Sequence, residues 1–206
     1  MDGTPSDLHS HFGGTYALSM PPNDSSDENL MMEYAAGNAA AFETLYQRYR
    51  APLYRYVLRN CSDPGISEEL FQDIWIKLIS AASRYQPTAS FKTYLYHIAH
   101  NRMTDHYRHQ GTRGTQTTLD IDSENTPQTA WLKAGEQPDQ KLANQRGVSR
   151  LLALIDDLPD PQREAFLLRE EGGLNLEQIA EITGVGRETV KSRLRYAIKS
   201  LREGLK

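Results

Sequence analysis

Hydrophobic residues recur at the three- and four-residue spacing of amphipathic helices in two separate parts of the chain. In residues 29–110 three such runs follow one another. The first begins at Phe42 and continues beyond Pro52, which predicts a break or kink at that proline. The second follows Ser67 and the third follows Ser90, and both serines suit the N-cap of a helix. These runs predict a first helical domain.

Residues 147–206 carry the same spacing and predict a second helical domain. Asp160 as N-cap and Pro161 at the first helical position predict a helix that ends at Gly172 and Gly173. No run of residues alternates between apolar and polar as a half-buried strand does. The expected fold is therefore all-α, with two small helical domains.

Two stretches lack helical spacing. Residues 1–28 are rich in Ser, Asp, Pro and Gly, which predicts a disordered acidic leader. Residues 111–146 are rich in Thr, Gln and Gly, which predicts a flexible linker. As a coil this linker would span about 30–36 Å, and fully extended it would reach about 120 Å.

The strongest local pattern lies in residues 174–201. Asn175 and Gln178 have the spacing of a capping box, and Gly184 suits the left-handed position that ends a helix. A second helix begins near Arg187, with an apolar stripe at Val190, Leu194, Ala197, Ile198 and Leu201. The pattern predicts a helix-turn-helix whose second helix enters the major groove of DNA.

The exposed N-terminal half of that second helix carries the candidate contacts to duplex DNA, namely Arg187, Glu188, Thr189, Lys191, Ser192, Arg193 and Arg195. Lys and Arg side chains neutralise phosphates or reach guanine, and Glu accepts from cytosine. An ordinary helical hairpin with a solvated basic face is the alternative.

The helix after Ser90 is expected to place aromatic and polar side chains together on its outer face. Aromatic rings next to Arg and Asn suit unpaired bases, which offer both π-faces and hydrogen-bonding edges. The outward residues are His97, His100, Asn101, Asp105, Arg108 and His109, and Tyr94, Tyr96 and Tyr107 are interleaved with them. The alternative is that tyrosines at helical spacing belong to the core or its boundary.

The formal net charge of −4 is unevenly distributed. Residues 1–47 hold seven acids and no Lys or Arg, and residues 156–181 hold eight acids against two arginines. Residues 187–206 hold seven bases against two acids. The basic end predicts a surface that faces a polyanion. The acidic leader would either cover that basic helix or remain a solvated tail.

Other classes of function have little support. No apolar stretch reaches the length of a membrane span, so no direct membrane insertion is expected. The one cysteine, Cys61, excludes an internal disulfide. His97 with His100, and His106 with His109, stand three residues apart, but no acidic or cysteine cluster completes a metal site. With no signal peptide, no membrane span and a single cysteine, the chain is expected to be cytoplasmic. Without a phosphate loop or a catalytic constellation, it is expected to use no cofactor and not to be an enzyme.

Two segments resemble the extracytoplasmic-function (group 4) sigma factors of bacterial RNA polymerase, in the sigma-70 family. Region 2 of that family resembles SEELFQDIWIKLISAASRYQPTASFKTYLYHIAHNRMTDHYRH, and region 4 resembles LPDPQREAFLLREEGGLNLEQIAEITGVGRETVKSRLRYAIKSLREGL. The resemblance covers about residues 30–110 and 150–205, in the family's order, and no block resembling region 3 lies between them.

The resemblance implies a sigma factor that binds core RNA polymerase and directs promoter-specific initiation. Docking on the clamp helices of the largest polymerase subunit would use Glu69, Gln72, Asp73 and Trp75, and the helix that carries them is expected to expose a polar and acidic face. The alternative for Trp75 is burial in the core. The −10 element of promoter DNA would be read, and its opened strand held, by the helix with Asn101, Arg102, Asp105 and Arg108. The helix from Arg187 would read the −35 element. Many members have a membrane-bound anti-sigma factor, so a partner of that kind is expected.

The sequence departs from the family at three positions: Tyr94 replaces a common Trp, His100 replaces a frequent Arg, and Gly186 replaces the usual Ser N-cap.

Two other classes of function remain open, a stand-alone helix-turn-helix regulator and a protein that occupies polymerase without directing initiation. The two promoter elements lie roughly 60–70 Å apart, so the linker must be stretched for both to be read. The free chain is therefore expected to bind promoter DNA poorly.

Overall fold

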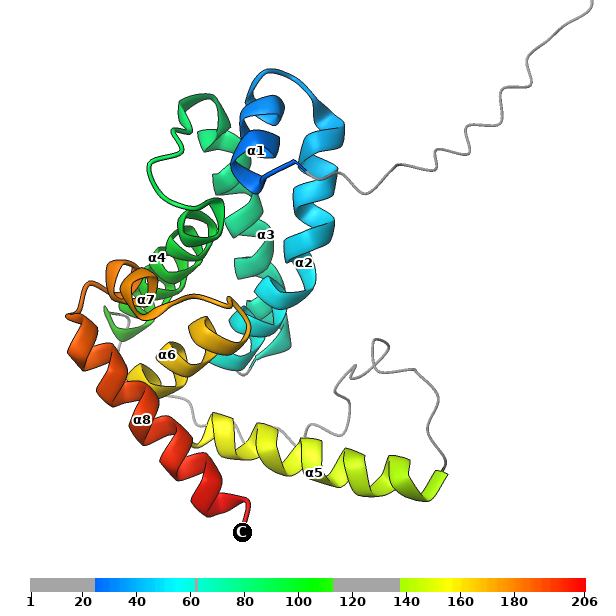
Figure 1. Cartoon of the computed structure of the whole chain (residues 1–206), viewed down its shortest axis with the longest axis vertical. Helices are drawn as coiled ribbons and strands as arrows, with labels where there is room; N and C mark the ends of the chain where they lie inside the picture. The colour runs from blue at the N-terminus through cyan, green and yellow to red at the C-terminus, as the bar shows by residue number, and fades with distance from the viewer. Residues whose placement is uncertain (1–24, 62, 113–137) are drawn as a thin grey trace, which may run out of the picture.

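The computed structural model describes residues 25–61, 63–112 and 138–206, and within these ranges every regular element is a helix, which confirms the all-α prediction (Figure 1). The first lobe contains α1 (Asp27–Ala35), α2 (Ala39–Cys61), α3 (Pro64–Ala81), the short 3₁₀ helix η1 (Ala82–Arg84) and α4 (Phe91–Thr112). The second lobe contains α5 (Pro138–Asp156), α6 (Asp160–Glu170), α7 (Leu176–Thr183) and α8 (Arg187–Gly204). Most of the predicted leader and linker lies outside the described residues.

Several helix boundaries differ from the sequence prediction. The helix α2 runs through Pro52 without a break, because Leu53, Tyr56 and Val57 beyond it are buried against the rest of the lobe. The N-cap of α3 is Asp63, whose carboxylate accepts from the Ile66 amide at 2.9 Å; Ser67 is buried inside the helix.

Two boundaries of the second lobe also shift. The helix α5 begins at Pro138, within the predicted linker, and packs against α8. In α6 the cap residue is Pro159, and Asp160 is the first helical residue. A shift of one residue at a helix end is common, whereas the early start of α5 places residues 138–146 of the predicted linker in a helix.

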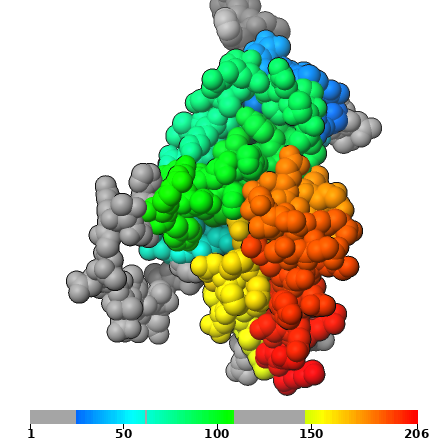
Figure 2. Space-filling model, turned by 90° about the vertical axis from the view of Figure 1, so that its left-hand side faces the viewer, coloured from blue at the N-terminus to red at the C-terminus, as the bar shows by residue number. Residues whose placement is uncertain are grey.

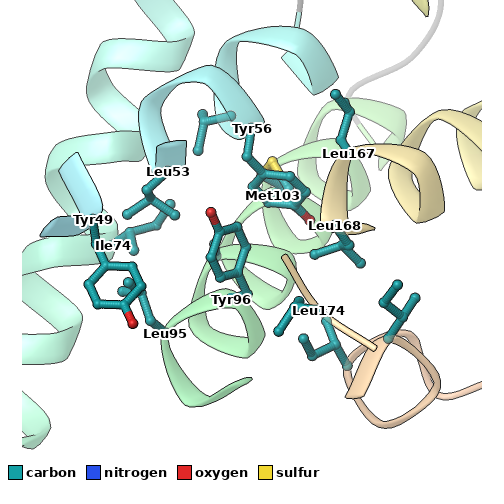
Figure 3. Close-up of a cluster of buried hydrophobic side chains, with 14 of the residues drawn as sticks. Tyr49, Leu53, Tyr56, Ile74, Leu95, Tyr96, Met103, Leu167, Leu168 and Leu174 are labelled. Carbon is teal, nitrogen blue, oxygen red and sulfur yellow. The ribbon is translucent and has the colours of Figure 1, made fainter. Parts of the chain in front are cut away.

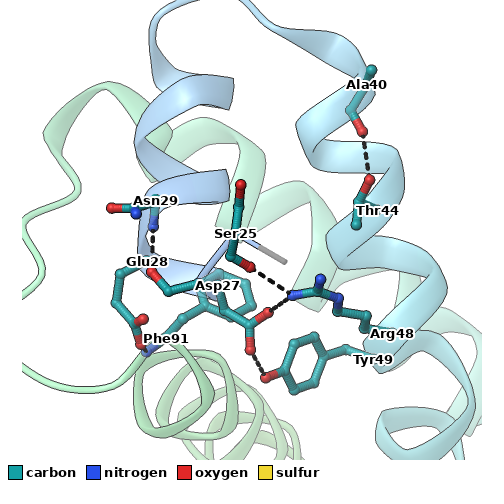
Figure 4. A network of polar contacts seen from close by, with 10 residues as sticks. Ser25, Asp27, Glu28, Asn29, Ala40, Thr44, Arg48, Tyr49 and Phe91 are labelled. Carbon is teal, nitrogen blue, oxygen red and sulfur yellow. Dashed lines mark hydrogen bonds and ion pairs between the residues drawn. The ribbon is translucent and has the colours of Figure 1, made fainter. Parts of the chain in front are cut away.

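The predicted leader ends earlier than expected, because α1 begins at Asp27 (Figure 4). The Asp27 carboxylate binds Arg48 at 2.5 Å and accepts from the Tyr49 hydroxyl, and burial together with this contact raises the pKa of Tyr49. The Glu28 carboxylate accepts from the Phe91 amide at 2.8 Å. That amide belongs to the first turn of α4, where helix N–H groups lack partners and favour an anion. The acidic residues of α1 therefore tie the start of the chain's described part to α2 and α4.

The two lobes pack directly against each other. Figure 2 shows the orange surface of α7 lying against the green surface of α4, and α6 also contacts α2. Between the lobes is an apolar cluster in which Tyr56, Tyr96 and Met103 of the first lobe meet the second-lobe leucines Leu167, Leu168 and Leu174 (Figure 3). The sequence predicted the helices of each lobe but not this shared core.

Candidate nucleic-acid interface

The helix-turn-helix predicted from residues 174–201 has the expected local geometry. Asn175 accepts from the Gln178 amide and the Gln178 side chain accepts from the Asn175 amide, each at 2.9 Å. Gly184 ends α7 with a φ of +67°, in the left-handed region that favours glycine. In α8, Val190, Leu194, Ala197 and Leu201 are buried, but Ile198, predicted to join them, is 39% exposed. The turn and its two helices follow from local signals.

The predicted duplex-DNA contacts on α8 differ in accessibility. Arg187, Glu188, Thr189, Lys191 and Arg195 are exposed, whereas Ser192 and Arg193 are half-buried. Lys191 and Arg195 lie four residues apart and so share one face of the helix. The structure therefore leaves most of this set available to DNA.

Arg187 is held by two carboxylates at the start of α8. Its Nε lies 2.5 Å from a Glu177 carboxylate oxygen, and its guanidinium also contacts Glu188 at 3.1 Å. The hydrogen bond with Arg187 lowers the pKa of Glu177 and raises that of Arg187. These exposed ion pairs contribute little to stability, but they orient the arginine beside the turn.

On α4, the outward-facing candidates follow one face of the helix. His97, Asn101 and Arg108 are exposed, and Asp105 is half-buried. The Asn101 side-chain nitrogen lies 3.4 Å from the His97 ring, and Arg108 pairs with Asp105 at 2.5 Å. This set, His97, Asn101, Asp105 and Arg108, is called the α4 face below.

The tyrosines of α4 divide among different surroundings. Tyr94 is half-buried, with its ring 5.3 Å from the ring of Tyr85. Tyr96, expected among the outward residues, is fully buried between the lobes. Tyr107 is exposed, and its hydroxyl donates a hydrogen bond to the Asn60 carbonyl at 2.9 Å. Tyr94 alone of these three stands beside the α4 face with part of its ring accessible.

Arg102 lies apart from the α4 face. Its side chain is only 17% exposed and donates two hydrogen bonds to the Asp73 carboxylate, at 2.9 and 2.6 Å. Glu69 lies 3.8 Å away on the same helix as Asp73. Arg102 therefore cross-links α4 and α3, since its half-buried guanidinium is paired with a carboxylate within the lobe. The base contact at Arg102 stays a prediction.

The predicted docking residues on α3 also separate into two groups. Glu69 and Gln72 are exposed and Asp73 is partly exposed, but Trp75 is 5% exposed and packs against the rings of Phe42, Tyr46 and Phe71. This aromatic cluster encloses Trp75, which agrees with the alternative that Trp75 belongs to the core. The docking role of Trp75 stays a prediction.

Sequence reasoning missed Ile76, whose side chain is 59% exposed. It follows Glu69 by seven residues and Gln72 by four, so the three share one face of α3. That spacing is the signal that distinguishes Ile76 from Trp75. This set, Glu69, Gln72, Asp73 and Ile76, is called the α3 face below.

Cys61 lies at the end of α2, beside a cavity of about 490 Å³ between the lobes. Burial raises the pKa of its thiol, so the reactive thiolate is scarcer at neutral pH than in a free cysteine. We expect iodoacetamide to modify Cys61 several-fold more slowly in the folded chain than in urea at the same pH. Mass spectrometry of quenched samples measures both rates, and equal rates would contradict the burial.

Two negative findings apply to residues 25–61, 63–112 and 138–206, the part of the chain that the structure describes. In these ranges no three His, Cys, Asp or Glu side chains are grouped so as to hold a metal ion. No helix there combines the length and the apolar character needed to cross a membrane. In the pair His97 and His100, the Nδ1 atom of His100 lies 2.5 Å from a carboxylate oxygen of Glu164.

Comparisons with known proteins match both lobes. The family Sigma-70 region 2 matches residues 45–113, and Sigma-70, region 4 matches residues 154–203. The chain is 30% identical over 183 residues to the ECF RNA polymerase sigma factor SigK of Mycolicibacterium vanbaalenii, covering 85% of this chain and 87% of that one. It is 30% identical over 187 residues to SigK of Mycobacterium ulcerans, covering 90% and 97%.

A solved structure shares the fold. It is the sigma factor RpoE in complex with the anti-sigma factor NepR from Bartonella quintana, with a TM-score of 0.62 at 20% identity, covering 80% of this chain and 96% of that one. The two matched regions, in the order region 2 then region 4, correspond to the two lobes and to the α3, α4 and α8 surfaces described above. The chain therefore belongs to the extracytoplasmic-function family of RNA polymerase sigma factors.

Proposed function

We propose that this sigma factor directs core RNA polymerase to promoters by a division between its lobes, in which α8 reads the −35 duplex and the α4 face holds the opened −10 strand. The observation that carries the proposal is the exposed basic half of α8, mounted on a helix-turn-helix. Region 2 and region 4 supply the family context for each lobe.

At the −35 element, Lys191 and Arg195 are the best placed cations. Both are exposed on one face of α8, where they can reach guanine edges or phosphates in the major groove. Glu188 lies one turn earlier and can accept from the cytosine amino group. Arg187, held by Glu177, would fix the start of the helix against the DNA backbone.

At the −10 element, the α4 face offers hydrogen-bonding groups, and Tyr94 offers a ring. Stacking of a base on an aromatic ring contributes about 1–3 kcal/mol, comparable to the cost of unstacking one base step. Bases that leave the duplex transiently would therefore be captured, which shifts the equilibrium towards open DNA. Strand opening by this route does not require the sigma factor to bind or hydrolyse ATP.

The α3 face would dock on the clamp helices of the largest polymerase subunit. Its exposed Glu69 carboxylate can pair with a cation of the partner, whereas Asp73 is already paired with Arg102, and Ile76 gives the face an apolar centre. Interfaces concentrate their binding free energy in such a desolvated centre with a polar surround. Ile76 thus takes the place that the sequence prediction gave to Trp75.

We further propose that an anti-sigma factor restrains the chain, in the way that the fold's Bartonella relative was solved with NepR. The sigma family is not an enzyme class, so phosphodiester chemistry would belong to polymerase. The chain would act in the cytoplasm, where polymerase and promoters are found.

Run-off transcription with purified core polymerase on a randomised promoter library tests this function. The expected result is that transcripts arise only when the chain is added, and that two sequence blocks about two DNA turns apart are enriched. A stand-alone regulator would give no transcripts without another sigma factor. A protein that merely occupies polymerase would suppress the transcripts that another sigma factor supports. Either of these results would overturn the proposal.

A further inference from the structure

An apolar groove lies along α2, beside Phe71 of α3. Its volume is about 240 Å³, and it is lined by Tyr46, Arg50, Ala51, Tyr54, Arg55 and Phe71. A cavity of about 150 Å³ in another protein binds benzene, so this groove has room for an aromatic or aliphatic side chain. The groove formed by these six residues is called the α2 groove below.

The α2 groove combines an aromatic lining with arginines at its edge. The rings of Tyr54 and Phe71 lie 5.4 Å apart, edge to face, and both side chains are half-buried. Arg55 is bound to Glu171 at 2.7 Å. Arg50 is exposed, and within the described residues no carboxylate pairs with it. The groove therefore fits an apolar segment that also brings negative charge.

Residues 1–24 lie outside the described residues, but their composition matches the groove. They hold three aspartates and no Lys or Arg. Within them, residues 15–20 read TYALSM and carry large apolar side chains at every second position, Tyr16, Leu18 and Met20. In an extended segment these three side chains would face the same side. The segment thus offers one apolar face in an acidic part of the chain.

The described part of the chain begins close to the α2 groove. The Ser25 carbonyl accepts from the Arg48 guanidinium at 3.3 Å (Figure 4). Ala51 and Arg55 follow Arg48 by three and seven residues and so share its face of α2. At about 1.5 Å per residue, they lie about 4.5 and 10 Å further along the helix axis. Met20 precedes Ser25 by five residues, which span up to about 17 Å, so the segment can reach the groove.

We propose that residues 15–20 dock in the α2 groove of the same chain, so that their three large apolar side chains cover its aromatic rings. The aspartates of the leader then lie near Arg50, where opposite charges favour this orientation. The leader is accordingly a partner of α2, rather than a cover for α8 or a solvated tail. The inference does not depend on the proposed function, because the contact involves neither DNA nor polymerase.

Photocrosslinking in the full chain tests the contact. The variant Tyr16→p-benzoylphenylalanine bonds to a neighbouring C–H group on illumination, and mass spectrometry of the digested monomer identifies that neighbour. We expect crosslinks to the peptides of α2 and α3 that carry Tyr54 or Phe71. A crosslink to α8 would show that the leader covers the basic helix, and a crosslinked dimer would show that a second copy fills the groove. No crosslink would show a solvated tail. Each of these three results would overturn the proposal.

Substitutions in the groove provide matched comparisons. Ala51→Trp fills the groove with an indole ring, whereas Ala40→Trp makes the same change at an exposed position near the start of α2. We expect Ala51→Trp to lower the crosslinked fraction about tenfold and Ala40→Trp to leave it unchanged. Arg50→Glu alters an exposed side chain and leaves the groove open, so its expected several-fold loss separates docking from misfolding. Equal crosslinked fractions in all three variants would contradict docking at this site.

The leader is tested from its own side by Leu18→Asp, with Ser10→Asp as the control that adds the same charge outside residues 15–20. Chymotrypsin cleaves after Tyr16, and synthetic peptides of residues 10–24 with the same substitutions correct for the intrinsic preference of the protease. We expect cleavage to be about tenfold faster in Leu18→Asp than in the unaltered chain, because a docked segment is cleaved only when it is released. Ser10→Asp should behave as the unaltered chain. Equal corrected rates in all three chains would show that the segment is not held, and the proposal would fail.

Discussion

Replacing Trp75 with alanine is expected to lower the free energy of unfolding by about 3–5 kcal/mol, the usual effect of removing a large aromatic side chain from a packed core. Trp75 is almost fully buried and makes edge contacts with the rings of Phe42, Tyr46 and Phe71, whose centroids lie 4.9–6.2 Å from its own. Urea unfolding followed by circular dichroism measures the change.

Ile76→Ser is the matched control for Trp75→Ala. Ile76 is the next residue on α3 and is largely exposed, so its loss should change the unfolding free energy by less than about 0.5 kcal/mol. The same variant should weaken binding to core polymerase, measured by competition with a labelled unaltered chain. If Trp75→Ala unfolded like the unaltered chain yet lost polymerase binding, the assignment of the two residues would have to be exchanged.

The double variant Lys191→Ala with Arg195→Ala is expected to reduce run-off transcription about 100-fold at limiting holoenzyme. A good side-chain contact to a base edge contributes about 1–3 kcal/mol of discrimination, and every 1.4 kcal/mol is a factor of ten. Both side chains are exposed, so their removal should leave the unfolding transition in place.

Arg202→Ala on the last turn of α8 provides the control for charge, since it removes a cation from the same helix beyond its predicted DNA-reading half. A template with a scrambled −35 element provides the control for sequence reading. On that template the double variant and the unaltered chain should transcribe almost equally. A 100-fold loss that persisted there would place Lys191 and Arg195 outside −35 recognition.

The helix-turn-helix could be predicted almost residue by residue because its signals are local. The capping box at Asn175, the left-handed Gly184 and the stripe from Val190 all lie within about one helix of the features they determine. Ile198 is the exception. It lies eight residues after Val190, at the edge of the buried stripe, and nothing packs over it closely enough to complete its burial.

The α3 and α4 surfaces could be predicted only in part, because a sequence pattern gives the face of a helix but not its partner. The family resemblance gave Arg102 a DNA contact, and the pattern along α4 does not show that Asp73, 29 residues earlier, lies beside it. The exposed face of α3 was predicted, but Trp75 and Ile76 are adjacent residues, and the sequence pattern did not show which of the two is exposed. Their assignment depends on aromatic rings contributed by α2.

The packing of the two lobes against each other could not be predicted from the spacing of hydrophobic residues. Arg55 and Glu171, which form an ion pair between the lobes, are separated by 116 residues. The acidic block that contains Glu171, residues 156–181, is equally typical of a solvated surface. The length of the linker showed only that the lobes could be apart. Which of the accessible arrangements is adopted depends on the fit between Tyr96 and the leucines of the second lobe, which no local pattern records.

The contact between Glu28 and the Phe91 amide has a practical consequence for work on the first lobe alone. A fragment that starts at residue 29, where the helical pattern first becomes obvious, would lack the carboxylate that meets the opening turn of α4 and the anchor that Asp27 gives to Arg48 and Tyr49. The helix proposed to hold the melted strand would then begin with a Phe91 amide that lacks its carboxylate partner, and only the Ser90 hydroxyl, which accepts from the Thr93 amide, would be left as a side-chain cap. Fragments intended for strand-binding assays should therefore start ahead of Ser25.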